Sequence, residues 1–71
     1  MKVLITTDFY GEYELWEAES LEDAKRYTAA MVKGLEAPEP GELIGTQDDI
    51  LAADAMKEAD EILYISDFEE D

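Results

Sequence analysis

Alternating apolar and polar side chains near the start of the chain predict two β-strands. In residues 2–9, every second side chain from Val3 onward points to one side of an extended segment. In residues 12–18, Tyr13 and Leu15 point to one side in the same way. The two segments follow each other closely, so we expect them to form an antiparallel hairpin.

The length of the turn sets the register of this hairpin. A two-residue turn would pair Phe9 with Glu12 and place a carboxylate on the apolar side of the hairpin. A three-residue turn over residues 10–12 avoids this conflict, and Gly11 can adopt a positive φ within it. We therefore expect the three-residue register. Its pairs are Phe9 with Tyr13, Thr7 with Leu15, and Ile5 with Glu17.

A helix is predicted over residues 21–33. Ser20 is a good N-cap residue, and Asp23 three positions later provides an acidic variant of the capping box. Gly34 is suited to the C-terminal cap. Apolar side chains recur at helical spacing, at Leu21, Ala24, Tyr27 or Thr28, Met31 and Leu35.

The segment that follows contains a loop and a second predicted helix. Two prolines and a glycine make residues 36–45 a Pro/Gly loop. Thr46 repeats the N-cap signature, which predicts a helix over residues 47–58. One face of this helix would carry mostly small apolar residues, at Leu51, Ala52, Ala55, Met56 and Ala59.

The last apolar run, residues 62–65, is rich in β-branched and aromatic side chains and predicts a third strand that ends near Phe68. Residues 69–71 form an acidic tail that we expect to fray. The chain is then one α+β domain of residues 1–71, with the element order ββααβ. We expect a three-stranded antiparallel sheet in the order 1-2-3 with both helices on one face. The alternative is the order 2-1-3, with strand three parallel to strand one.

Composition excludes several function classes. The 71 residues include no Cys and no His, which removes disulfides, zinc clusters, and Ser-His or Cys-His nucleophiles. A chain of this size offers little room for a substrate cleft, so we expect no enzymatic activity and no cofactor. Asp48, Asp49 and Asp54 are the nearest approach to an oxygen-ligand cluster, but they lack the calcium-loop spacing. We therefore expect no dedicated metal site. Without a signal-peptide or membrane-spanning run, a cytoplasmic location is the expectation.

Charge is the most informative feature. Twenty acids stand against five bases, a formal net charge of −15, so we expect no direct binding to nucleic acid or to an anionic membrane. The phosphates of a DNA strand are spaced by ~3.4 Å along the axis and roughly 6–7 Å along the winding backbone. Alternate residues of a strand are ~6.6 Å apart, and i,i+4 residues of a helix are ~6 Å apart. Pairs of acids with this spacing can therefore imitate phosphates.

The candidate partner-binding residues combine these acids with one aromatic side chain. Trp16 is predicted on the hairpin face opposite Tyr13 and Leu15, away from the helices, where an exposed Trp could anchor an interface. The complete candidate set is Glu12, Glu14, Trp16, Glu17, Glu19, Asp48, Asp49, Asp54, Glu58, Asp67 and Glu69.

The segment Trp16-Glu17-Ala18-Glu19-Ser20-Leu21-Glu22-Asp23-Ala24-Lys25 looks like the strand-to-helix junction of several small phage proteins. With its size and charge, the chain resembles phage-encoded inhibitors of bacterial defence, especially DNA-mimicking anti-CRISPR proteins. The resemblance implies a non-enzymatic inhibitor that occupies a basic nucleic-acid-binding groove, foremost that of a CRISPR effector, in the host cytoplasm. Two alternatives remain: an acidic antitoxin or regulator that neutralises a basic protein, and a halophile-type domain whose charge serves only solubility.

Overall fold

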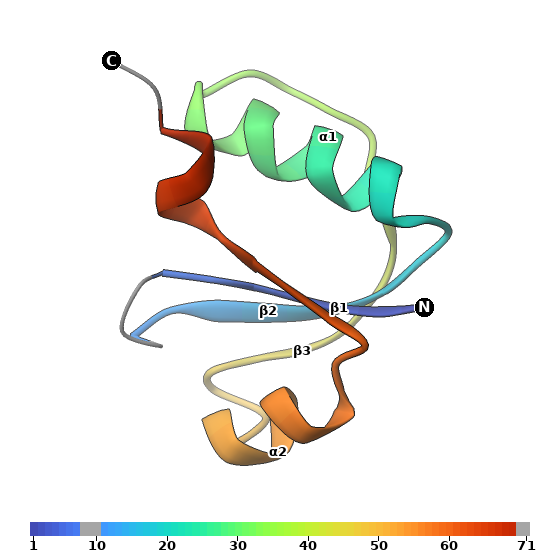
Figure 1. Cartoon of the computed structure of the whole chain (residues 1–71), viewed down its shortest axis with the longest axis vertical. Coiled ribbons are helices and arrows are strands. Elements are labelled where there is room, and N and C mark those ends of the chain that lie inside the picture. The colour runs from blue at the N-terminus through green and yellow to red at the C-terminus, as the bar shows by residue number, and fades with distance from the viewer. Residues whose placement is uncertain (8–10, 70–71) are drawn as a thin grey trace.

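The computed structural model describes residues 1–7 and 11–69 and shows an α+β fold with a single four-stranded sheet (Figure 1). The element order is ββαβαβ, followed by a short 3₁₀ helix, rather than the predicted ββααβ. The elements are β1 (Lys2–Thr6), β2 (Tyr13–Ala18), α1 (Leu21–Val32), β3 (Gly41–Thr46), α2 (Ala52–Glu58), β4 (Glu61–Tyr64) and the 3₁₀ helix η1 (Ile65–Phe68).

The sheet is mixed, with the strand order β3-β2-β1-β4. β1 pairs antiparallel with β2 and parallel with β4, and β2 pairs antiparallel with β3. The predicted three-stranded antiparallel sheet is therefore wrong, and the 2-1-3 alternative holds for the three strands it included. The connection from β3 through α2 to β4 crosses the sheet, because β3 and β4 lie at its two edges. Such a crossover joins parallel strands, and both β3 and β4 run in the direction of β1.

The two helices cover opposite faces of the sheet, not one face as predicted (Figure 1). The apolar run of β1 explains this arrangement, because Val3 and Ile5 point to the α1 face while Leu4 points to the α2 face. All three side chains are 0–1% exposed. A central strand that is apolar on both sides needs a covering layer on both faces.

The hairpin register differs from the predicted one by three residues. Leu4 lies opposite Leu15, and Thr6 lies opposite Tyr13. The expected pairs Thr7–Leu15 and Ile5–Glu17 are therefore wrong, and the expected pair of Phe9 with Tyr13 does not form. Phe9 itself lies outside the described residues. The observed register buries apolar side chains on both faces of β1. The prediction considered only the face that carries Val3 and Ile5, and this face alone does not select the register.

The first helix agrees closely with its prediction. α1 begins after Ser20, whose Oγ accepts a hydrogen bond from the Asp23 backbone N–H at 3.1 Å. It ends at Val32, and Gly34 just beyond its C-cap has a φ of +72°. The Gly34 N–H donates to the Met31 carbonyl, and the Leu35 N–H donates to the Ala30 carbonyl. These two bonds form a Schellman motif, which satisfies carbonyls at the helix C-terminus.

Part of the predicted Pro/Gly loop is a strand. Residues 36–40 have no regular structure, but Gly41–Thr46 form the edge strand β3. Gly41 is required there, because a Cβ at this position would lie 1.9 Å from the Glu17 carbonyl oxygen. Pro40 comes just before the strand, where its missing N–H costs no ladder bond. Glycine therefore marks a close approach of two strands here, and not a flexible connection.

The second helix is shorter than predicted. Residues 47–50 form a turn, and α2 begins only at Ala52. Thr46 does cap this turn, since its Oγ1 accepts from the Asp48 N–H at 3.3 Å. The Tyr13 hydroxyl donates to the Ile50 carbonyl and fixes the end of the turn against β2. This tertiary contact holds the segment outside a helical path.

The C-terminal strand is also shorter than expected. β4 ends at Tyr64, and Ile65 to Phe68 turn into η1, where Ile65 and Phe68 pack against the core under α1. The predicted fraying concerned residues 69–71, of which 70–71 lie outside the described residues. The described residues contain no helix that is long and apolar enough to span a membrane.

Candidate functional site

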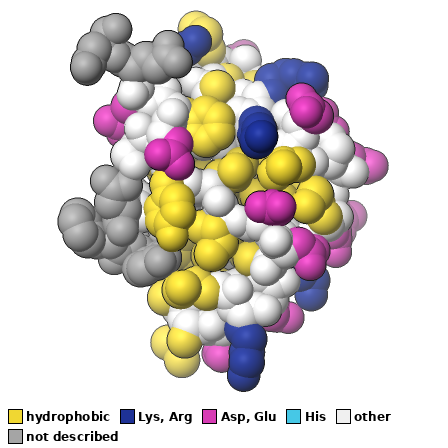
Figure 2. Space-filling view, viewed as in Figure 1, with side chains coloured by type: hydrophobic (Ala, Val, Ile, Leu, Met, Phe, Trp, Pro, Cys, Tyr) yellow, Lys and Arg dark blue, Asp and Glu magenta, His cyan; other side chains and the backbone are white. Residues whose placement is uncertain are grey.

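Acidic side chains rim an apolar hollow where the end of β1 meets the start of β2. We call this the acid-rimmed hollow. It has a volume of about 340 Å³, and five elements (β1, β2, α1, β3 and η1) and two turns contribute to it. Ile5, Met31 and Ile65 provide its apolar surface. Its full lining is Ile5, Glu12, Tyr13, Glu14, Met31, Thr46, Gln47, Asp48 and Ile65. Figure 2 shows apolar side chains gathered on one face of the molecule, with acidic side chains among and around them.

Glu14 is a carboxylate of the acid-rimmed hollow that accepts two side-chain hydrogen bonds. It lies in β2 between two residues that face α2, so its own side chain points to the α1 face. The Trp16 Nε1–H donates to Glu14 Oε1 at 2.9 Å, and the Tyr27 hydroxyl donates to the same oxygen at 3.3 Å. Both bonds hold Oε1, so neither donor occupies the second carboxylate oxygen.

The ionisation of Tyr27 is linked to this carboxylate. Partial burial raises the pKa of the Tyr27 hydroxyl, and the negative charge of Glu14, its hydrogen bond, and the charge of Glu39 raise this pKa further. Tyr27 therefore stays protonated and remains a donor to Glu14 at neutral pH. Helical spacing predicted only that Tyr27 or Thr28 lies on the apolar face of the helix, and no sequence signal indicated the contact of Tyr27 with Glu14.

Trp16 is buried, which corrects its expected role as an exposed anchor. The prediction that Trp16 lies on the opposite face of the strand from Tyr13 and Leu15 is confirmed. That face is covered by α1, however, and Trp16 is only 4% exposed. Its ring meets the Tyr27 ring edge-to-face, with centroids 5.3 Å apart. Trp16 therefore contributes to the core and orients Glu14, but it offers no surface to a partner.

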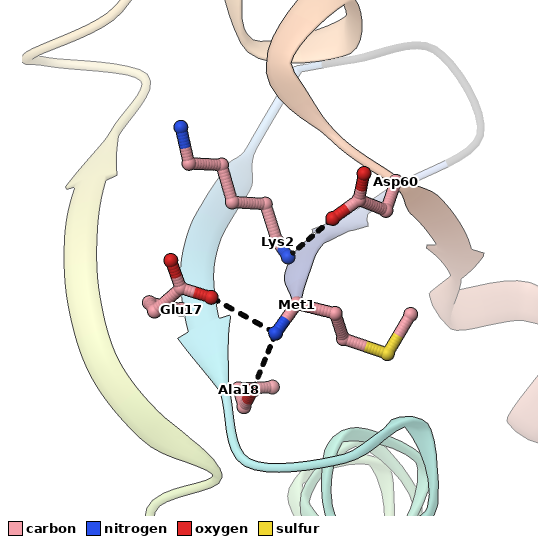
Figure 3. Close-up of polar contacts among 5 residues, drawn as sticks. All are labelled: Met1, Lys2, Glu17, Ala18 and Asp60. Carbon is pink, nitrogen blue, oxygen red and sulfur yellow. Dashed lines mark hydrogen bonds and ion pairs between the residues drawn. The ribbon is translucent and has the colours of Figure 1, made fainter.

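A second hollow lies at the other end of β2, and we call it the N-terminal hollow. It has a volume of about 650 Å³. The amino group of Met1 forms an ion pair with Glu17 at 2.9 Å and donates to the Ala18 carbonyl at 2.9 Å (Figure 3). The lining residues are Met1, Glu17, Ala18, Glu19, Glu39, Gly41 and Glu42. Four of these seven residues are glutamates.

Like charges face each other across the strands beside the N-terminal hollow. Glu17 of β2 lies directly opposite Glu42 of β3, and both side chains are exposed. Directly opposed like charges destabilise a sheet. Nearby, the Lys2 backbone N–H donates to Asp60 at 2.9 Å (Figure 3), and Lys2 Nζ forms an ion pair with Glu58 at 3.4 Å. The Met1 amino group and the Lys2 ammonium balance only part of the local negative charge.

The remaining candidate acids lie elsewhere. Asp48 borders the acid-rimmed hollow, whereas Asp49 accepts bonds from the Thr46 N–H and hydroxyl and so belongs to the turn. Asp54 lies on the exposed surface of α2, together with Glu58. Asp67 lies in η1, and Glu69 follows it. The structure thus groups Glu12, Glu14 and Asp48 at one end of β2, and Glu17 and Glu19 at the other.

Two residues outside the candidate set shape these groups. Glu39 and Glu42 add carboxylates to the N-terminal hollow, although the loop prediction for residues 36–45 gave them no defined place. Within the ranges that the structure describes, no group of three or more acidic side chains is arranged to hold a metal ion. No known protein family, no curated protein and no solved structure matches the chain.

Proposed function

We propose that this protein is a non-enzymatic inhibitor that acts as a DNA mimic. It would occupy a basic nucleic-acid-binding groove of a bacterial defence complex, foremost a CRISPR effector. Carboxylates would take the place of phosphates opposite Lys and Arg side chains of the target. The net charge of −15 would steer the two proteins together over a long range.

The opposition of Glu17 and Glu42 is the observation that carries this proposal. Two glutamates side by side on neighbouring strands repel each other, and the single Met1 amino group beside Glu17 offsets this repulsion only in part. Neither glutamate belongs to a core cluster. Their repulsion would be relieved by a partner that brings cations to this surface. Glu19 and Glu39 extend the same acidic surface around the N-terminal hollow. A basic groove is the environment that such a surface suits.

The experiment is a competition assay in which the protein displaces DNA from a purified CRISPR effector. The test variant carries Glu17→Gln, Glu19→Gln and Glu42→Gln. The matched control carries Glu22→Gln, Glu36→Gln and Glu61→Gln, which are also exposed, lie outside the candidate set and remove the same total charge. We expect the test variant to lose about tenfold or more in affinity, and the control to lose much less.

Salt provides a second measurement in the same assay. Affinity should fall steeply as ionic strength rises, because screening weakens the contacts between carboxylates and cations. The protein alone should not shift DNA in a gel. An affinity that is unchanged from low to high salt, or equal losses for both triple variants, would contradict phosphate mimicry at the N-terminal hollow.

An antitoxin-like function is the second candidate, and the acid-rimmed hollow favours it. An apolar surface bordered by Glu12, Glu14 and Asp48 suits a Lys or Arg side chain, whose stem is apolar and whose head is charged. A basic toxin or regulator could provide such a side chain without any competition with DNA. Capture of a basic protein that never binds nucleic acid would favour this candidate over the DNA mimic.

A further inference from the structure

β3 lies at one edge of the sheet. β3 is the last strand on its side of the sheet and pairs with β2 alone among the strands of the described ranges. Two large apolar side chains on it are exposed, Leu43 by 48% and Ile44 by 41%. Natural sheet edges are commonly protected by Lys, by Pro or by a β-bulge. β3 contains neither Lys nor Pro, but its register with β2 shifts after Leu43, and the Thr46 N–H donates to Asp49. The open part of the edge is therefore Gly41 to Leu43.

The hydrogen-bond pattern identifies which backbone groups of β3 point outward. Met1 and Ala18 exchange two backbone bonds, so the main-chain groups of Ala18 are directed to β1 and not to β3. The Glu19 N–H is directed the other way and donates to the Pro40 carbonyl at 2.9 Å. Because bonded and non-bonded pairs alternate along an antiparallel ladder, the N–H and C=O of Leu43 point away from β2.

The side chains around this edge specify the chemistry of an added strand. Glu42 points to the α2 face, where Glu17 lies beside it, whereas Leu43 points to the α1 face. A strand that pairs with this edge would therefore meet negative charge on one face and an apolar side chain on the other. Exposed Glu39 and Asp48 place further negative charge near the two ends of β3.

We propose that β3 recruits an extended segment of a protein partner in which basic and apolar residues alternate, by adding that segment as a fifth strand. Charge complementarity selects this occupant over a second copy of the chain, since each copy carries a net charge of −15. Main-chain bonds would supply affinity, and the alternating side chains would supply specificity. The proposal rests on the proposed function only in that the partner is a basic protein.

The probe is a synthetic peptide of roughly eight residues in which Lys and Val alternate, long enough to cover one strand. Its control has Glu in place of every Lys. NMR titration of the unaltered protein should show saturable binding of the Lys/Val peptide, which slows hydrogen exchange at the Leu43 amide. The Glu/Val peptide should not bind, because it adds negative charge next to Glu42.

Two variants at one position separate the backbone contact from the side chain. Leu43→Pro removes the outward N–H and leaves the bonds of β3 to β2, while Leu43→Thr keeps the N–H and removes the apolar side chain. We expect Leu43→Pro to weaken peptide binding about tenfold or more and Leu43→Thr to weaken it much less. Circular dichroism checks that both variants fold, and the exchange measurement on the unaltered protein needs no variant.

Each other outcome overturns the proposal: no peptide binding, binding that protects amides away from β3, or equal binding by Leu43→Pro and the unaltered protein. The peptide assay contains neither DNA nor a defence complex. Failure of the DNA competition assay with normal peptide binding would therefore contradict only the DNA mimic. The reverse result would leave DNA mimicry supported and contradict strand addition at β3.

Discussion

The α1 face and the α2 face of the sheet bury similar apolar residues but are covered by helices of different construction. α1 has twelve residues, a Ser20 side-chain cap and a Schellman motif, and it packs on β1, β2, β4 and η1. α2 has seven residues, its N-cap position is Leu51 without a side-chain cap bond, and it packs mainly on β1. Both capping signals and packing therefore stabilise α1, whereas α2 depends mainly on its contact with the sheet.

The largest expected effect comes from a charge placed under each helix. Ala24 of α1 and Ala55 of α2 are both 0% exposed, so Asp at either position buries an unpaired charge. We expect Ala24→Asp to cost more than about 3 kcal/mol and to unfold the protein. Ala55→Asp should cost less, about 2–3 kcal/mol, because the short α2 can move away from the sheet.

Urea unfolding followed by fluorescence makes this comparison direct, because Trp16 is the single tryptophan and is buried under α1. In Ala55→Asp, Trp16 should keep its buried emission in the absence of urea while circular dichroism shows a loss of helix. Equal destabilisation by the two variants would show that α2 is as integral to the fold as α1.

The helix caps should give effects of about 1 kcal/mol in opposite directions. Ser20→Ala removes the bond to the Asp23 N–H and should lower the free energy of unfolding by about 1 kcal/mol. Leu51→Ser supplies the side-chain cap that α2 lacks and should raise it by ~0.5–1 kcal/mol. Leu51 is 74% exposed, so little burial is lost. Denaturant midpoints measure both changes, and a destabilising Leu51→Ser would show that Leu51 packs in solution.

A smaller effect is expected at the opposed glutamates on the α2 face. Glu42→Gln should raise the free energy of unfolding by a few tenths of a kcal/mol (~0.2–1), because it relieves repulsion with Glu17. The gain should shrink at high salt. Glu22→Gln removes the same charge from the first turn of α1, where a carboxylate is favourable, and should give no gain. Equal gains for both variants would attribute the effect to total charge alone.

The smallest effect concerns Tyr27 on the α1 face and is confined to alkaline pH. Folding raises the Tyr27 pKa above its ordinary value of 10.0, so the native state holds this proton more tightly than the unfolded state. Its contribution to stability is complete below pH 10 and is lost as pH rises through the higher folded-state pKa. Unfolding curves between about pH 8 and 11 should therefore differ in slope between the unaltered protein and Tyr27→Phe. Parallel curves would contradict the raised pKa.

The candidate site was predictable only in its chemistry. Composition indicated an acidic surface, and Glu12, Glu14, Glu17 and Glu19 were singled out by their spacing. Their division between two hollows depends on the observed register and on β3, which supplies Glu42. Trp16 illustrates the same limit. The alternating pattern of β2 predicted on which face of the sheet Trp16 lies, but it could not predict that α1 covers this face.

The sequence by itself determined, through short-range signals, the α1 helix, its Ser20 and Gly34 caps, and the extended conformation of residues 2–6 and 13–18. Each of these depends on side chains within a few positions along the chain. Only the tertiary structure decided the strand order, the hairpin register, the opposite placement of the two helices and the strand within residues 41–46. These features depend on contacts between distant segments: β1 buries both faces, and Gly41 admits the Glu17 carbonyl. No local pattern records which distant segment will provide such a contact.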